Sequence, residues 1–78
     1  MYKPVTKHFY AFKVLTVSAQ DEEAVRTTVI GAHNKTAAKE CLEYVLGLEA
    51  LRVKHIYNMA SFDDEAGAQW QIEQWEMK

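Results

Sequence analysis

Cysteine, proline and glycine are all scarce in this sequence of 78 residues. The lone cysteine, Cys41, excludes an internal disulfide framework and indicates a reducing compartment such as the cytoplasm. The three glycines, at positions 31, 47 and 67, are isolated, which excludes a glycine-rich loop that cradles phosphate groups. No apolar run approaches the ~18 residues that a membrane-spanning helix requires.

An excess of either charge is also missing, because the formal net charge is only −2. Proteins that bind DNA regardless of its sequence usually carry a strong basic excess, so this class is disfavoured. Residues 1–12 lack the apolar core of a signal peptide. We therefore expect a cytoplasmic protein that does not associate with membranes.

What is present suits one small globular domain over residues 1–78. Hydrophobic residues make up 49% of the chain and charged residues 26%, which is typical of a folded protein rather than a disordered one. A domain of this length lies near the lower limit for folding without disulfides or metals.

The first half of the chain predicts a β-hairpin. Residues 8–19 are rich in aromatic and β-branched side chains, and both alternating sets are largely apolar, which is typical of a central strand. Residues 24–32 predict a second strand. The polar break between them is short, so the two strands should pair antiparallel.

Residues 34–46 predict a helix. Asn34 is a good N-cap because its side-chain oxygen can accept a hydrogen bond from an amide of the first turn. Apolar residues then recur at helical spacing, and Gly47 is expected to end the helix in the left-handed conformation.

The second half predicts two more strands. Residues 51–60 alternate polar with apolar, and a turn follows at residues 62–67. The tail alternates through Ile72 and then changes phase, which favours a fourth strand with a β-bulge. A short helix is the alternative, although Trp70 and Met77 would then lie opposite Ile72 and Trp75. The predicted fold is α+β, ββαββ, with one helix packed on a small, mostly antiparallel sheet of strand order 2-1-3-4.

Residues with catalytic or metal-binding chemistry form no constellation in the sequence. His8, His33 and His55 lack the short spacing of metal ligands. Cys41 falls on the apolar stripe of the helix, where a small core residue is the usual role. We therefore expect no metal, no cofactor and no catalytic residue, so the protein should not be an enzyme.

A partner-binding surface is the main functional expectation. One helix covers one sheet face, so the other face should carry an apolar patch that suits a partner, unless the N-terminal residues or the tail cover it. We expect two acidic turns to steer a basic partner and four aromatic residues to anchor it, while Trp70 is expected in the core. The steering residues are Asp21, Glu22, Glu23, Asp63, Asp64 and Glu65, and the anchors are Tyr10, Phe12, Tyr57 and Trp75.

Two alternatives remain open at this point. Lys13, Arg52, Lys54 and Tyr57 fall on strands that are predicted to be neighbours, and basic and aromatic side chains on a sheet are how several modules bind RNA or single-stranded DNA. The third possibility is a homodimeric structural module that is joined through the bare sheet face or an edge strand.

The order of elements also resembles a group of small phage proteins. A hairpin, a helix that starts in GAHNKTAAKE and a return strand LRVKHIY are similar in layout to phage inhibitors of bacterial RNA polymerase and to some anti-CRISPR proteins, over residues 8–60. The tryptophan-containing tail departs from the three-stranded polymerase inhibitors. The resemblance implies a non-catalytic phage inhibitor or adaptor of the host-takeover class. Such a protein acts in the cytoplasm of a bacterial host, where it blocks the working surface of a protein or nucleoprotein complex.

Overall fold

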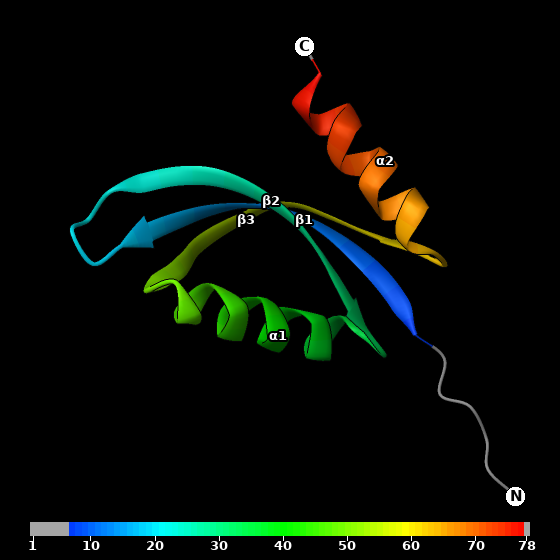
Figure 1. Cartoon of the computed structure of the whole chain (residues 1–78), viewed down its shortest axis with the longest axis horizontal. Helices are drawn as coiled ribbons and strands as arrows, with labels where there is room; N and C mark the ends of the chain where they lie inside the picture. The colour runs from blue at the N-terminus through cyan, green and yellow to red at the C-terminus, as the bar shows by residue number, and fades with distance from the viewer. Residues whose placement is uncertain (1–6, 78) are drawn as a thin grey trace, which may run out of the picture.

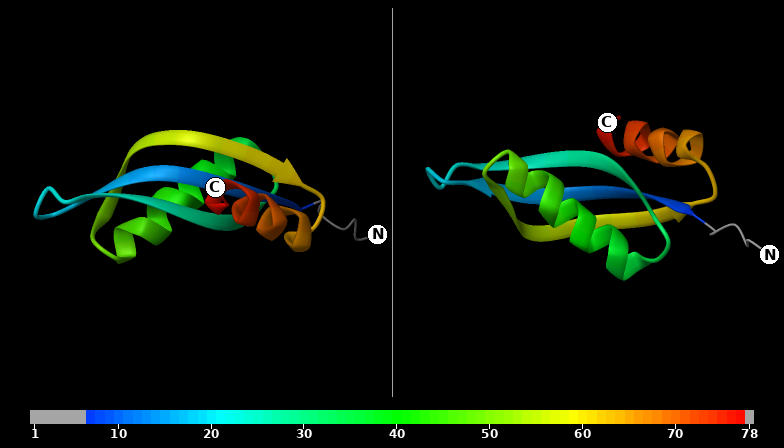
Figure 2. Two further views of the ribbon diagram at one scale, coloured as in Figure 1. Left: turned by 90° about the horizontal axis from the view of Figure 1, so that it is seen from above. Right: turned by 60° about the horizontal axis from the view of Figure 1, so that its bottom comes forward.

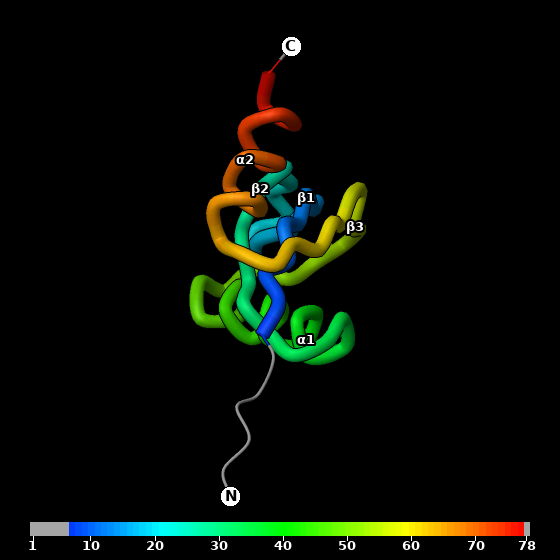
Figure 3. Tube along the Cα trace, turned by 90° about the vertical axis from the view of Figure 1, so that its right-hand side faces the viewer, coloured from blue at the N-terminus to red at the C-terminus, as the bar shows by residue number. Residues whose placement is uncertain are grey.

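The computed structural model describes residues 7–77 and consists of three layers (Figure 1). A three-stranded antiparallel sheet of order β2-β1-β3 forms the middle layer, and one helix packs on each face. The end-on view in Figure 3 shows the two helices on opposite sides of the strands. The elements in chain order are β1 (His8–Ser18), β2 (Glu23–Ala32), α1 (Lys35–Leu48), β3 (Leu51–Phe62) and α2 (Glu65–Glu76).

The α+β class and the neighbours of the three strands are confirmed, but the predicted fourth strand is wrong. The tail forms α2, which begins at Glu65. Ala68, Ile72 and Trp75 are spaced as one helical stripe, and this stripe packs on the sheet. Trp70 and Met77 are 56% and 68% exposed, so the stripe does not need to include them. The expectation that Trp70 lies in the core is therefore also wrong.

The start of α1 is as predicted, whereas its end is not. The side chain of Asn34 accepts a hydrogen bond from the Ala37 amide at 2.8 Å. The helix continues through Gly47 to Leu48, because Leu46 is still buried against the sheet and the last turn completes around it. Ala50, not Gly47, takes the left-handed conformation, with φ 60°.

The main core lies between α1 and the sheet. Tyr10, Phe12 and Val14 of β1 are buried there against Leu42 and the other buried residues of the helix. Figure 2 shows α1 running diagonally across the strands. This packing removes a continuous apolar surface from water, and it is the largest stabilising feature of the described residues.

A smaller core lies on the opposite face, beneath α2. Ala11 of β1 meets Ala68 and Ile72 of the helix, and four partly buried residues surround them. Those four are Phe9, Val29, Phe62 and Trp75. The tail thus covers part of the face that was expected to be bare. Cover by the tail is the alternative that the sequence leaves open for this face.

Two β-bulges in β3 decide which of its side chains share a face. The pairing with β1 shifts between Lys13 and Val14 and again between Leu15 and Thr16, so Tyr57 and Lys54 are the extra residues of β3. The apolar residues of β3 that face α1 are therefore spaced unevenly, at Leu51, Val53, Ile56 and Met59. The regular alternation predicted for this strand is wrong for that reason.

Candidate binding surfaces

The sheet face that carries α2 is only half covered. The helix packs over the end of the sheet where β1 begins, and the end towards the β1–β2 turn stays bare in Figure 1. Side chains alternate along β1, so Lys13 and Leu15 point to the same face as Ala11. What we call the open sheet surface also contains three of their four partners across the ladders, Arg52 opposite Val17, and the two bulge residues. It comprises Lys13, Leu15, Val25, Arg52, Lys54, His55, Tyr57 and Asn58.

An aromatic pair lies within the open sheet surface. The rings of His55 and Tyr57 meet edge to face with their centroids 4.9 Å apart, and Tyr57 remains 47% exposed. Leu15 is partly exposed beside His55, and Val25 is 54% exposed on the neighbouring strand. A tyrosine with apolar neighbours is typical of the centre of a binding surface.

Basic side chains surround this centre. Lys13 pairs with Asn58 across the β1–β3 ladder, and Arg52 lies opposite Val17. Lys54 reaches across β1 to form an ion pair with Glu23, and both side chains remain about half exposed. An exposed pair of this kind contributes little to stability.

The structure therefore brings together all four residues that were proposed for nucleic-acid binding, Lys13, Arg52, Lys54 and Tyr57. Sequence reasoning missed His55, Asn58 and Val25 as members of the same surface. The signal for the β3 residues lies in the uneven spacing of apolar residues from Leu51 to Met59, which no regular strand produces.

The two acidic runs begin in turns, as expected, and each ends in the first residue of an element, Glu23 of β2 and Glu65 of α2. They lie at opposite ends of a molecule that extends over 50 × 30 × 15 Å (Figure 1). Asp21 takes a left-handed conformation in the β1–β2 turn, with φ 62°. Asp64 caps α2, because its side chain accepts a hydrogen bond from the Gly67 amide at 2.7 Å. The two runs thus cannot act as one compact patch, and Asp64 has a structural role.

The predicted aromatic anchors also separate. Tyr10 and Phe12 are 7% and 0% exposed beneath α1, so they are unavailable to a partner. The prediction that these two residues anchor a partner is therefore wrong. Trp75 is half-buried beside the smaller core, and Tyr57 is the exposed member of the four.

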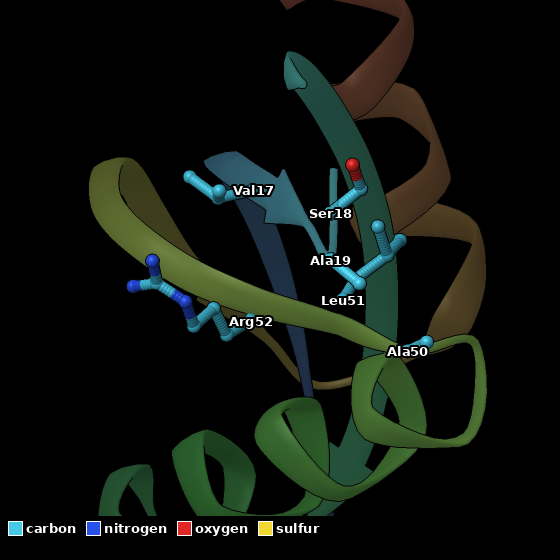
Figure 4. A pocket seen from close by; sticks show the side chains of 6 residues that line it. All are labelled: Val17, Ser18, Ala19, Ala50, Leu51 and Arg52. Atoms are coloured by element: carbon cyan, nitrogen blue, oxygen red, sulfur yellow. The ribbon is translucent and has the colours of Figure 1, made fainter. Parts of the chain in front are cut away.

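A shallow pocket of about 260 Å³ opens at the end of the sheet next to the β1–β2 turn. Figure 4 shows its lining side chains, which come from the end of β1, the start of β3 and the residue next to each of these strand ends. Leu51 and Arg52 leave β3 on different sides, and only small or apolar residues accompany them. The lining residues are Val17, Ser18, Ala19, Ala50, Leu51 and Arg52, a set that lacks the convergent polar groups of a ligand pocket.

Metal-binding clusters and membrane-spanning helices are both absent from residues 7–77. No group of three or more His, Cys, Asp or Glu side chains comes together there to hold a metal ion. Neither helix in that part of the chain has the length and apolar character needed to cross a bilayer. Cys41 is partly buried against the main core, as its place on the apolar stripe predicts.

Comparisons with protein-family models, with curated protein sequences and with solved structures find no match for this chain.

Proposed function

We propose that this protein is a non-catalytic inhibitor or adaptor of the phage type, which binds a host protein complex through the open sheet surface and blocks a working surface there. The observation that carries the proposal is the exposed Tyr57–His55 pair, set among partly exposed apolar residues and ringed by basic side chains. Protein interfaces commonly have such an apolar centre and a polar rim.

The side chains around the Tyr57–His55 pair are basic, so the expected partner is acidic rather than basic. Lys13, Arg52 and Lys54 lie around Tyr57, whereas the acidic turns lie at the two ends of the molecule, and of their residues Glu23 reaches the rim through its ion pair with Lys54. A basic rim would steer the surface towards an acidic patch and set the register of docking. The acidic turns would then disfavour approach along other directions, since like charges repel.

The test is an affinity purification from the native host with matched pairs of variants. Tyr57→Ala and Lys13→Glu should each lose the bound species, with at least a tenfold fall in the amount recovered if Tyr57 is a hot spot worth ~2 kcal/mol. The controls are Tyr44→Ala and Lys39→Glu on α1, because Tyr44 is 68% exposed and Lys39 is also exposed. Loss of the bound species with the α1 variants and retention with the sheet variants would contradict the proposal.

A second candidate function, binding of single-stranded RNA or DNA, is favoured by the same aromatic pair and by three cations on one sheet face. With three phosphate contacts, the logarithm of affinity should fall with the logarithm of salt concentration with a slope of about −2. Fluorescence anisotropy of labelled oligonucleotides measures this slope directly. If no binding occurs at low salt, this candidate is excluded and the protein-binding proposal is unaffected.

A further inference from the structure

The two edges of the sheet are built differently. At one edge, β2 pairs with β1 in an unbroken register from His8↔Ala32 to Val17↔Glu23. At the other edge, the two bulges at Tyr57 and Lys54 interrupt β3. Within residues 7–77, no further strand pairs with the outer side of either edge.

An unprotected edge strand is a template for another strand, because its outward N–H and C=O groups are aligned and unpaired in the sheet. Proteins block such pairing with bulges, lysine or proline, and β3 carries two bulges and Lys54. In contrast, β2 has no bulge in its pairing and no proline, and its charged residues, Glu23 and Arg26, both lie near its start.

We infer that β2 pairs with β2 of a second copy of this chain, antiparallel and around a two-fold axis at Thr27. The resulting dimer would contain one continuous six-stranded sheet. This inference does not depend on the proposed function. It would place two open sheet surfaces on the same side of the dimer, since a two-fold perpendicular to the sheet keeps equivalent faces together.

The side chains of β2 complement one another in this register. With Thr27 opposite its own copy, Val25 lies opposite Val29 on both sides of the axis. Opposite residues share a face, and Val25 and Val29 both belong to the face that carries α2. Val25 is 54% exposed in the single chain, so pairing would remove apolar surface from water. On the other face Arg26 lies opposite Thr28, and no two like charges on β2 face each other.

One interaction opposes the dimer. The carboxylate of Glu76 accepts a hydrogen bond from the Thr27 hydroxyl at 3.2 Å, so the two Glu76 side chains would approach each other near the axis. Their repulsion is screened by salt, so added salt should strengthen association. Glu76→Gln should tighten the dimer by up to about fivefold, the effect of removing one unfavourable cross-strand charge pair.

Sedimentation velocity of the full chain from ~1 μM to ~1 mM tests the inference, because weak dimers have dissociation constants in this range. We expect a concentration-dependent dimer that Val25→Lys abolishes. The control Asn58→Lys adds the same charge to the protected edge strand, and it should leave the dimer intact. A chain that stays monomeric at every concentration, or a dimer that Asn58→Lys but not Val25→Lys removes, would overturn the inference.

A cross-linking measurement keeps the test decisive if Val25→Lys fails to fold. In a Cys41→Ser background, Thr27→Cys should form covalent dimers with a short bismaleimide at least tenfold faster than Asn58→Cys does, because the axis passes through position 27. Equal rates at the two positions would also overturn the inference.

Discussion

The two faces of the sheet bury very different amounts of apolar side chain. Beneath α1, Phe12 and Leu42 are 0% and 1% exposed, and the core continues along the helix. Beneath α2, the buried cluster consists of Ala11, Ala68 and Ile72, and the rest of that face forms the open sheet surface. The core on the α1 face is thus the larger source of stability, whereas the other face is divided between α2 and the open sheet surface.

The largest expected effects on stability come from truncating one buried side chain in each of the two cores. Leu42→Ala should lower the free energy of unfolding by ~3–4 kcal/mol, whereas Ile72→Ala should cost ~2 kcal/mol because its smaller core is closer to water and can relax. Urea titration followed by circular dichroism measures both values. If Leu42→Ala does not fold, the milder pair Leu42→Val and Ile72→Val preserves the comparison. An equal or larger loss of stability from truncating Ile72 would contradict the claim that the α1 face is the main source of stability.

Hydrogen exchange should show the same inequality without any mutation. Because α2 rests on few buried residues, it should open without the rest of the fold, and its slowest amides should exchange at least ~10-fold faster than those of α1. Mass spectrometry of peptides from each helix measures the two rates. Equal protection in the two helices would mean that both faces unfold together.

The two N-caps sharpen the distinction further. Asn34→Ala and Asp64→Ala each remove a side-chain acceptor from a first-turn amide and should each cost ~1 kcal/mol. If α2 opens alone, Asp64→Ala should accelerate exchange in α2 with little change elsewhere. In contrast, Asn34→Ala should lower the unfolding midpoint of the whole domain. The reverse pattern would place the main stability on the α2 face.

The smallest effects concern the C-terminal end of α1. Gly47 lies inside the helix with open space where a Cβ would be, so Gly47→Ala should stabilise the protein by ~0.5–1 kcal/mol. Ala50 holds a left-handed conformation, so Ala50→Gly should relieve strain and also stabilise slightly, by up to ~1 kcal/mol. Thermal unfolding of each variant, and of the double variant, measures these gains. A loss of stability from Gly47→Ala would show that the helix does not continue through position 47.

The sequence predicts the order of the elements from β1 to β3 and the neighbours of the three strands, because their signals are local. The doubly apolar β1 indicates a central strand, and Asn34 followed by an apolar stripe indicates where α1 begins. The helix of the tail is not predicted, because Trp70 and Met77 are large and apolar yet exposed. A helix whose large side chains all face the core would place them in one stripe, and these two residues lie outside it.

The candidate binding surface is only partly predictable from the sequence, and the reason is the bulges in β3. Regular alternation assigns His55 and Tyr57 to the same face as Val53, whereas the extra residues turn them towards the face that carries α2. The grouping of Lys13 with Arg52 and Lys54 was anticipated, because it depends only on β1 and β3 being neighbours.

The most direct test of the open sheet surface compares two exposed tyrosines in the native host. A photo-cross-linking amino acid replaces Tyr57 in one variant and Tyr44, on α1, in the other. We predict one discrete cross-linked species from position 57, and we predict that Lys13→Glu in the same chain removes it. Cross-linking from position 44 with none from position 57 would contradict the assignment of the binding surface to the open half of the sheet.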